Sequence, residues 1–313
     1  MSASNPLLKG AAAGLLGALT LVVLCGTGSA PAQQPAKAVF GALPLPTDGP
    51  ARALGFYAKG CLAGAQALPV DGPAWQVMRL SRDRNWGTPA LINYIETLGG
   101  TAAAKDGWTG LLVGDMSQPR GGPMASGHAS HQIGLDVDIW LRPMPKRHLS
   151  AQERESMAAT PVVEPGPHIV DPKAWTDAHF RLLRRAASDP QVERIFVAPG
   201  IKKELCESES GDRSWLAKMR PYWGHNDHFH VRLKCPAGAA DCRSQDPPPQ
   251  GDGCGKELDY WYTDAPYRKA PPSNQPPPRP VTLADLPAAC TAVVNAASRP
   301  GALTSEDQFR SKE

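Results

Sequence analysis

The stretch GHASHQIGLDVDIW, residues 127–140, places two histidines three residues apart and then two aspartates two residues apart. Apolar and polar residues alternate in its second half. Successive side chains of an extended strand point to opposite faces, so Leu135, Val137 and Ile139 would share one face. Asp136 and Asp138 would share the other. The stretch therefore predicts a strand with one apolar face and one face that carries two carboxylates.

A second stretch, WGHNDHFHVRLKC at residues 223–235, shows the same alternation. Its apolar face would hold Phe229, Val231 and Leu233, and its polar face would hold His228, His230 and Arg232. The two stretches together contain five of the eight histidines of the chain. If both strands belong to one sheet, their imidazoles and carboxylates meet on the face opposite the core. Burying so many polar groups is costly unless something binds them.

The residue types of this polar cluster are those that bind a metal ion. A catalytic zinc takes three protein ligands from His, Asp, Glu or Cys and keeps a fourth position for water. Imidazole nitrogen and carboxylate oxygen suit that ion. The chain offers His131, an aspartate of the first strand and a histidine of the second. Residue chemistry alone does not decide between Asp136 and Asp138, or between His228 and His230.

Other patterns along the chain predict both helices and strands. Apolar residues recur at three- and four-residue steps at 89–98 and 173–188, which predicts helices. Strand-like runs occur at 110–116, 134–141, 193–199 and 228–235. The elements interleave without a regular βαβ rhythm. We therefore expect an α+β fold in which a central antiparallel sheet carries the metal site, flanked by helices and by long, disulfide-tied loops.

Residues 1–32 have the layout of a secretory signal peptide. Lys9 precedes an uncharged apolar run at 11–24, and small residues follow, with a cleavage site of the A-x-A type at residues 30–32. The apolar run is shorter than the ~20 residues that cross a bilayer. Lipid attachment at Cys25 is an alternative, but the bulky Leu24 before it fits that processing poorly. We expect export, with no stable membrane anchor after cleavage.

The charge of the chain argues against nucleic acid as a partner. The formal net charge is +3, and removal of Lys9 with the signal leaves 3 − 1 = +2. The chain has no polybasic tract of the kind that binds phosphate backbones.

The cysteines predict disulfides. Of the seven in the chain, Cys25 leaves with the signal, and six remain, an even number in an oxidising compartment. The chain has no CxxC pair, which argues against zinc bound by thiolates. From the sequence alone, only the short loop from Cys235 to Cys242 is favoured as a pair.

The spacing His131-x6-Asp138 together with His228-Phe229-His230 resembles the LAS metallopeptidases, the group of lysostaphin, the D-alanyl-D-alanine metallopeptidases and the hedgehog domain. Longer strings are similar to the penicillin-insensitive murein endopeptidase family: SRDRNWGTP at 81–89, VGDMSQPRGGPMASGHASHQIGLDVDIWL at 113–141 and PYWGHNDHFHVRLKCP at 221–236. The similarity runs from about Cys61 to Cys290.

This resemblance implies roles for individual residues. The zinc ligands would be His131, Asp138 and His230, and His228 and His225 would be the catalytic residues, with their division of labour open. His128 would also line the cleft. Apart from the resemblance, Arg82 and Arg84 are candidates for binding substrate carboxylates, because guanidinium binds carboxylates in a fork; the alternative for both is a surface salt bridge or a contact that holds the loop. Asp136 is a further candidate for the cleft. Asp136 is better explained as a hydrogen-bond acceptor beside a ligand, or as a solvated carboxylate, than as a ligand itself. The implied disulfides are Cys61–Cys290, Cys206–Cys254 and Cys235–Cys242.

The resemblance also implies an activity. It is the zinc-dependent hydrolysis of D-alanyl-meso-diaminopimelyl crosslinks between peptidoglycan stem peptides, by a periplasmic enzyme that forms a homodimer. Because a metal-activated water needs no serine nucleophile, penicillin should not inhibit the reaction. The alternatives are a D-alanyl-D-alanine carboxypeptidase, in which Arg82 or Arg84 binds the free carboxylate, and a non-catalytic zinc-containing module that binds the cell wall.

We expect four segments in all. They are the signal at 1–32, an N-terminal segment at 33–60, the zinc metallopeptidase domain at 61–298 and a disordered tail at 299–313. The domain would include a proline-rich connection at about 265–280, because proline forms neither helix interior nor central strand, and a C-terminal helix after it. Of Trp86, Trp140 and Trp223, two should pack in the core. His148, His168 and His179 should lie at the surface.

Overall fold

A computed structural model describes residues 34–166, 168–269 and 275–312. The predicted signal peptide at 1–32 lies outside the described residues, as does the middle of the proline-rich connection at 270–274. Within the described part of the chain, no helix is both long and apolar enough to cross a membrane.

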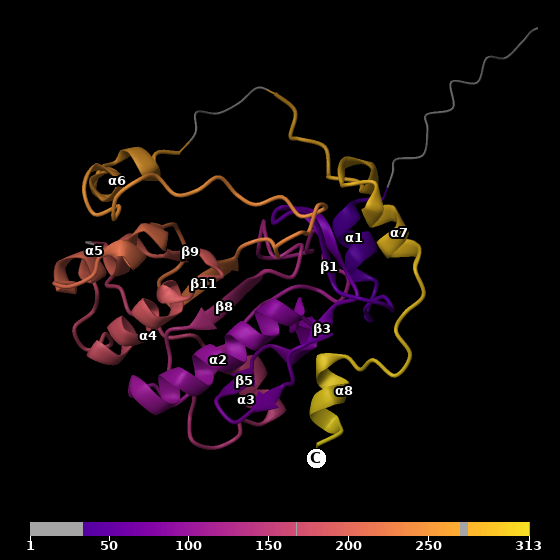
Figure 1. The fold of residues 1–313 in the computed structure, drawn as a ribbon, viewed down its shortest axis with the longest axis horizontal. Helices are drawn as coiled ribbons and strands as arrows, with labels where there is room; N and C mark the ends of the chain where they lie inside the picture. The colour runs from indigo at the N-terminus through magenta and orange to yellow at the C-terminus, as the bar shows by residue number, and fades with distance from the viewer. Residues whose placement is uncertain (1–33, 167, 270–274, 313) are drawn as a thin grey trace, which may run out of the picture. The chain divides into compact units, whose positions relative to one another are not determined.

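A seven-stranded sheet forms the centre of the fold (Figure 1). Its strands, in spatial order, are β10 (Met219–Pro221), β9 (Val192–Val197), β11 (His228–Leu233), β8 (Asp136–Trp140), β7 (Leu111–Val113), β5 (Trp75–Val77) and β4 (Asp71–Gly72). The four middle strands, from β9 to β7, pair antiparallel as expected. All four predicted strand runs are present.

The sheet is mixed rather than purely antiparallel, which corrects the expectation. β10 pairs with β9 in parallel, and β5 pairs with β7 in parallel. A helix lies between the two strands of each parallel pair: α5 (Pro199–Ser208) follows β9, and α2 (Pro89–Lys105) precedes β7. Such a crossover returns the chain in its original direction, so the next strand joins in parallel.

The two faces of the middle strands differ as predicted. In the register of β8 and β11, His230 lies opposite Asp138, and Val231 lies opposite Val137. Val137 and Ile139 of β8, and Phe229, Val231 and Leu233 of β11, are buried in one core. This alternation directs the histidines and aspartates to the other face of the same strands.

Helices α2 and α4 (Asp177–Ser188) pack into this core. Thr88 caps α2, and the apolar side of the helix buries Leu91, Ile95 and Leu98 at the predicted spacing. Helix α4 starts four residues later than predicted, because Thr176 and His179 cap each other at its start. His179 is therefore buried rather than at the surface, and its Nε2 also lies 3.1 Å from the carbonyl of Leu141.

Smaller elements complete the structure. They are α1 (Ala36–Gly41), β1 (Arg52–Phe56), β2 (Lys59–Ala63), β3 (Gln66–Ala67), β6 (Trp86–Gly87), α3 (Ala151–Ser156), α6 (Lys256–Asp259), α7 (Ala289–Asn295) and α8 (Ser305–Arg310). β1 and β2 form an antiparallel hairpin across the boundary predicted at 60–61. Hydrogen bonding between the two strands makes the segment at 33–60 continuous with the domain expected to begin at residue 61. One compact unit runs from Gln34 onward.

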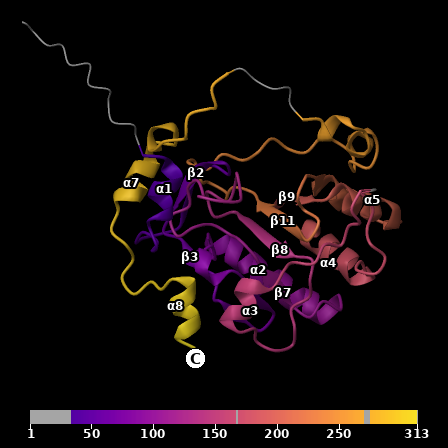
Figure 2. The same cartoon turned by 180° about the vertical axis from the view of Figure 1, so that it is seen from behind.

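Three disulfides join distant or looped parts of the chain, with the pairing that the family resemblance implies. Cys61–Cys290 ties β2 to the predicted C-terminal helix α7, beside α1 (Figure 2). Cys206–Cys254 holds a loop against α5, and Cys235–Cys242 closes a short turn after β11. These bonds confirm the expectation of disulfide-tied loops.

The segment expected to be a disordered tail contains helix α8. The backbone N–H of Ser305 donates to Asp83 Oδ1 at 2.8 Å, and its hydroxyl donates to the carbonyl of Leu80. The ring of Phe309 lies against the guanidinium of Arg154. These contacts are with residues more than 150 positions earlier, so the short polar segment gave no local sign of them.

Candidate metal centre

His131 lies in the loop that leads into β8. Its φ is 65°, a left-handed conformation that non-glycine residues adopt rarely and that clusters at functional sites. Its backbone N–H donates to Asp136 Oδ2 at 3.0 Å, which holds this conformation. At Gly134, φ is +71°, and a Cβ would come within 2.5 Å of Leu62. Only glycine fits there, which lets the loop approach Leu62 closely.

The side chains of His131, Asp138 and His230 converge on one buried point. The distance from His131 Nε2 to Asp138 Oδ1 is 3.4 Å, and His230 Nδ1 lies 3.3 Å from the same oxygen. All three residues are at most 5% exposed. Neither ring nitrogen of His131 nor Asp138 Oδ1 has a hydrogen-bond partner among the described residues. A buried polar atom without a partner is expensive, so this group has free donor atoms that could hold a ligand.

The protonation of His230 follows from its neighbours. Its Nε2 lies 3.0 Å from Asp136 Oδ1, and because an ionised carboxylate only accepts, Nε2 carries the hydrogen. Burial lowers the pKa of His230 to about 4, so the ring is neutral. The lone pair of a neutral ring is then on Nδ1, the atom that faces Asp138.

The donor atoms fit a small cation. Two ligands bound to one zinc at 2.0–2.1 Å in tetrahedral geometry lie roughly 3.3 Å apart, close to the distances around Asp138 Oδ1. The pKa of His131 is also consistent with a bound cation. Burial alone would lower the pKa of His131, but the charge of Asp138 raises it. Around His131, the buried site therefore favours positive charge.

Asp136 lies behind the converging atoms and is fully buried. Its oxygens accept from Arg232 Nε at 2.8 Å, from His230 Nε2 and from the backbone of His131. Burial would raise the pKa of Asp136, but the charge of Arg232 and the hydrogen bond from His230 hold it far below its usual range. The residue is thus a hydrogen-bond acceptor that orients its neighbours, and the expectation that it lines the cleft is wrong.

A second carboxylate, Asp115, was missed from the sequence. Its Oδ2 lies 2.9 Å from His128 Nε2, 3.0 Å from Arg82 and 2.7 Å from Arg84. Burial would raise the pKa of Asp115, but the hydrogen bond with His128 and the guanidinium charges lower it to about 2. An acidic residue directly after a buried strand was the available signal.

The contacts with Asp115 fix the positions of Arg82, Arg84 and His128. Arg84 is 8% exposed and also reaches Ser126, so it braces the loop from within rather than facing the cleft. Arg82 is half-exposed. His128, His131 and Asp138 form a group whose ligand atoms lie within 4.8 Å of one another and could hold a metal ion.

His225 and His228 lie beside each other, with ring centroids 4.9 Å apart. Burial lowers the pKa of His225 to about 4, which keeps that ring neutral. Burial also disfavours charge on His228, but the hydrogen bond with Asp227, at 2.6 Å, and the charge of Asp138 raise its pKa. The pKa values of the two histidines therefore shift in opposite directions, which makes His228 the better proton carrier.

Comparisons with known proteins identify the family of this chain. A family model described as penicillin-insensitive murein endopeptidase matches residues 53–295. A protein of that name from Haemophilus influenzae is 47% identical over 220 residues, which cover 70% of this chain and 76% of the relative. Relatives of the same name from Klebsiella pneumoniae and Yersinia pestis are 41% and 43% identical over 250 residues, covering 80% of this chain and 88% of theirs. The chain belongs to the penicillin-insensitive murein endopeptidase family, as its motifs predicted.

Proposed function

We propose that this chain is a zinc-dependent endopeptidase that hydrolyses D-alanyl-meso-diaminopimelyl crosslinks in murein. The names of its relatives support the reaction class and the polymer. The observation that carries the zinc proposal is the convergence of buried lone pairs of His131, Asp138 and His230. Without a cation, these donor atoms would face one another at about the distance that separates two ligands of the same zinc ion.

His230 is a better third ligand than His128. His128 Nε2 lies near two carboxylates, Asp115 at 2.9 Å and Asp138 at 3.4 Å, and needs its hydrogen for them. His230 has its hydrogen on the far nitrogen and a lone pair toward Asp138. We therefore assign His131, Asp138 and His230 as ligands and place His128 at the wall of the cleft.

A bound zinc would supply a Lewis acid for the scissile carbonyl and activate water for attack. The remaining chemistry belongs to the chain. His228, whose pKa is raised, carries a proton to the departing amine, and Asp227 orients its ring. Neutral His225 lies beside it and donates its Nδ1 hydrogen to the carbonyl of Trp223 at 2.6 Å. No serine nucleophile is needed, so a β-lactam should leave the activity intact.

Murein as the substrate also supports the proposed export by the signal at 1–32 and action in the periplasm. The homodimer remains a prediction. The carboxypeptidase alternative needs a free cation for a terminal carboxylate, and both candidate arginines pair with Asp115. The alternative of a non-catalytic binding module gives no reason for the paired His225 and His228.

The reaction is tested by incubating the protein with purified crosslinked muropeptide dimers and with pentapeptide monomers, followed by mass spectrometry. We expect dimers to be cut to monomers, pentapeptides to stay intact, and a chelator to stop the reaction until zinc is restored. Penicillin should have no effect. Loss of terminal D-alanine from monomers instead of crosslink cleavage would contradict the proposal.

The role of His228 is tested by His228→Ala. We expect kcat on muropeptide dimers to fall ~100-fold or more, because proton transfer of this kind contributes that much, while the zinc content of the purified protein is unchanged. His148→Ala, at a histidine whose side chain is 77% exposed, is the matched control. Zinc loss in His228→Ala would show that His228 is a ligand.

A further inference from the structure

Exposed aromatic side chains gather in one region of the protein. Among the described residues, eight large hydrophobic side chains are exposed, and five of these are aromatic. All five come from two short segments, 222–223 and 260–267. We call the following residues the aromatic surface: Tyr222, Trp223, Tyr260, Trp261, Tyr262 and Tyr267. Trp261 is partly exposed, and the others are between 39% and 47% exposed.

Ring contacts join the two segments. The centroids of Tyr222 and Trp223 are 5.0 Å apart, and Trp223 and Trp261 are 4.8 Å apart. Tyr260 continues the series at 6.0 Å from Trp261. Four rings from segments almost forty residues apart therefore form one continuous surface, held mainly by the Trp223–Trp261 contact.

The aromatic surface is continuous with the candidate active site. The ring of Tyr222 lies 5.7 Å from that of His225, which in turn lies 4.9 Å from His228. Phe196 of β9 supports both Tyr222 and His230 from below. A ligand that extends from the reacting bond past His225 would therefore meet Tyr222 and Trp223 next.

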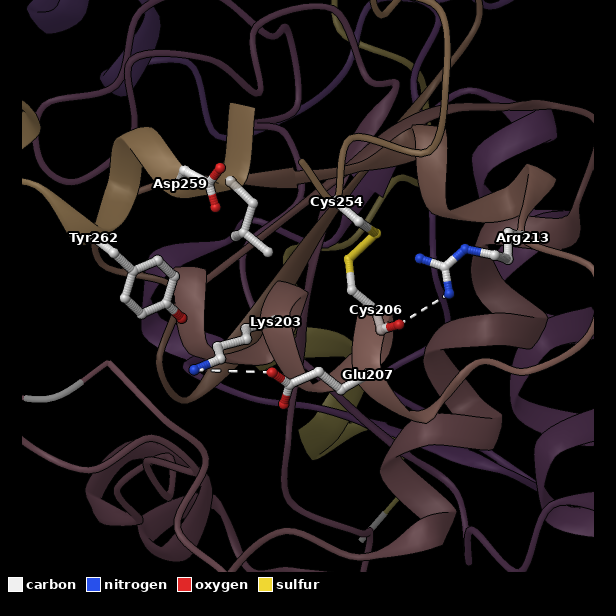
Figure 3. Close-up of a pocket in the computed structure, with 8 residues that line it drawn as sticks. Lys203, Cys206, Glu207, Arg213, Cys254, Asp259 and Tyr262 are labelled. Carbon is white, nitrogen blue, oxygen red and sulfur yellow. Dashed lines mark hydrogen bonds and ion pairs between the residues drawn. A yellow bond between two sulfur atoms is a disulfide. The ribbon is translucent and has the colours of Figure 1, made fainter. Parts of the chain in front are cut away.

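At its other end, the aromatic surface borders a pocket of about 540 Å³. Figure 3 shows the ring of Tyr262 on one side of this pocket and the Cys206–Cys254 disulfide on the other. The Lys203 ammonium lies 3.8 Å from Glu207 and also over the Tyr262 ring. The carboxylate of Asp259 projects nearby (Figure 3). The pocket therefore combines one aromatic wall with charged hydrogen-bonding groups.

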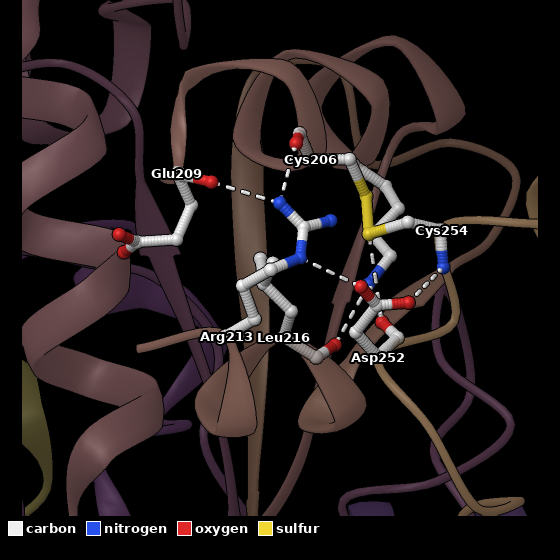
Figure 4. Close-up of a disulfide and its surroundings, with 7 residues drawn as sticks. Cys206, Glu209, Arg213, Leu216, Asp252 and Cys254 are labelled. Atoms are coloured by element: carbon white, nitrogen blue, oxygen red, sulfur yellow. Dashed lines mark hydrogen bonds and ion pairs between the residues drawn. A yellow bond between two sulfur atoms is a disulfide. The ribbon is translucent and has the colours of Figure 1, made fainter. Parts of the chain in front are cut away.

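The pocket is firmly supported from beneath. Arg213 donates to the carbonyls of Cys206 and Glu209 and to Asp252, next to the disulfide (Figure 4). Buried Lys202 donates to the carbonyl of Leu216 at 2.7 Å. The loop that carries Cys254 is thus fixed to α5 by covalent and polar bonds, which gives a preformed surface.

We propose that the aromatic surface and this pocket bind a glycan strand of murein and so present its crosslinked peptides to the active site. A pyranose ring has an apolar C–H face that stacks on indole and phenol rings and a rim of polar groups that hydrogen-bond to side chains beside them. Tyr and Trp offer that combination of apolar body and polar tip. The proposal rests on the proposed function, because murein supplies both the glycan and the peptide.

A protein partner fits the surface less well. The cores of protein interfaces are depleted in charged residues, whereas Lys203, Glu207 and Asp259 adjoin the aromatic rings here. A second copy of this chain would have to bury those charges at the centre of the interface. Contact with the active-site histidines also favours the substrate polymer as occupant.

The test compares Trp261→Ala with Trp261→Phe, which keeps a ring. Binding of peptide-free murein glycan strands is measured by calorimetry, independently of catalysis. We expect wild type and Trp261→Phe to bind, and Trp261→Ala to bind about tenfold more weakly, since one stacked ring contributes roughly that factor. Leu303→Ala, at an exposed side chain outside the aromatic surface, is the control and should bind as wild type does.

Kinetics give the second readout. Trp261→Ala should raise KM about tenfold for intact crosslinked murein and leave both kcat and the cleavage of glycan-free peptide dimers unchanged. Equal glycan binding by wild type and Trp261→Ala would overturn the proposal. The proposal would also be overturned if the protein bound no glycan and if light scattering showed that Trp261→Ala changes a dimer into a monomer. That result would assign the aromatic surface to contact with a second copy of the chain. Glycan binding without any peptide cleavage would instead refute the proposed function and leave this inference standing.

Discussion

Asp136 shows how one buried side chain organises the residues of the candidate metal centre. It holds the ring of His230 through Nε2, the backbone of His131 through its N–H, and the guanidinium of Arg232. Carboxylates that hydrogen-bond to a ligating histidine fix its tautomer and strengthen metal binding. The alternation of the sequence placed Asp136 on the correct face, and its three donors explain why it is not itself a ligand.

Asp136→Asn should weaken zinc binding ~10- to 100-fold, because the amide orients His230 less strongly. It should also reduce the free energy of unfolding of the metal-free protein by ~3–5 kcal/mol, because buried Arg232 loses its counter-charge. Zinc titration against a competing chelator and urea unfolding measure the two effects. Asp264→Asn, at an exposed aspartate, should change neither. Unaltered zinc affinity in Asp136→Asn would contradict the orienting role.

At the scale of elements, the guanidinium of Arg154 joins α3 to the edge of the sheet. This fully buried residue of α3 donates to the carbonyls of Val70 and Val77 and forms an ion pair with Asp71 of β4. Phe309 of α8 covers its outer side. Burial would raise the pKa of Asp71, but Arg154 lowers it below its ordinary value.

This lowered pKa predicts a pH dependence of stability. A carboxyl group with a depressed pKa in the folded state stabilises the protein above its unfolded pKa of roughly 4, and the contribution disappears as pH falls through the folded value. Asp71→Asn should therefore destabilise the protein above the unfolded pKa and approach wild type as the pH falls through the lowered pKa of folded Asp71. Urea unfolding of wild type and Asp71→Asn at a series of pH values measures this difference in stability. A difference that stays constant at every pH of the series would show that the ion pair is not responsible.

Periodicity predicted the elements whose local pattern matches their burial. The strands β8 and β11 and the helix α2 each have one apolar side that faces the core, so the sequence alone carries that information. The direction of the strands at the sheet edges depends on how the crossover helices pack against the sheet. The sequence of a single segment does not contain that information. Helix α8 depends on contacts with Asp83 and Leu80, far away in sequence.

The site was predictable to a similar degree. Spacing brought His131, Asp138 and His230 together, and family resemblance chose among the alternatives. Spacing could not identify Asp115, because its importance arises from the arginines and the histidine that surround it in space. It also could not show that Arg84 is buried. Which charged side chains pair with one another depends on the tertiary structure and not on the local sequence.

At the scale of the whole molecule, Cys61–Cys290 closes the longest covalent loop, with a sequence separation of 229. The double variant Cys61→Ala with Cys290→Ala should lose about 5–6 kcal/mol of stability, from the chain-entropy cost of a loop this long. Removal of Cys235–Cys242, with a separation of 7, should cost only about 2–3 kcal/mol. Denaturant unfolding of both double variants gives the order, and the reverse order would contradict this explanation.

The same long-range bond has a consequence for biosynthesis. A ribosome releases Cys61 long before Cys290, and Cys206, Cys235, Cys242 and Cys254 emerge in between. Joining thiols strictly in order of appearance would couple Cys61 to Cys206, which the native structure does not contain. Maturation must therefore either delay oxidation of the earliest thiol until translation is nearly finished or exchange a wrong partner afterwards. Either route makes the final steps of synthesis a checkpoint for the enzyme's assembly.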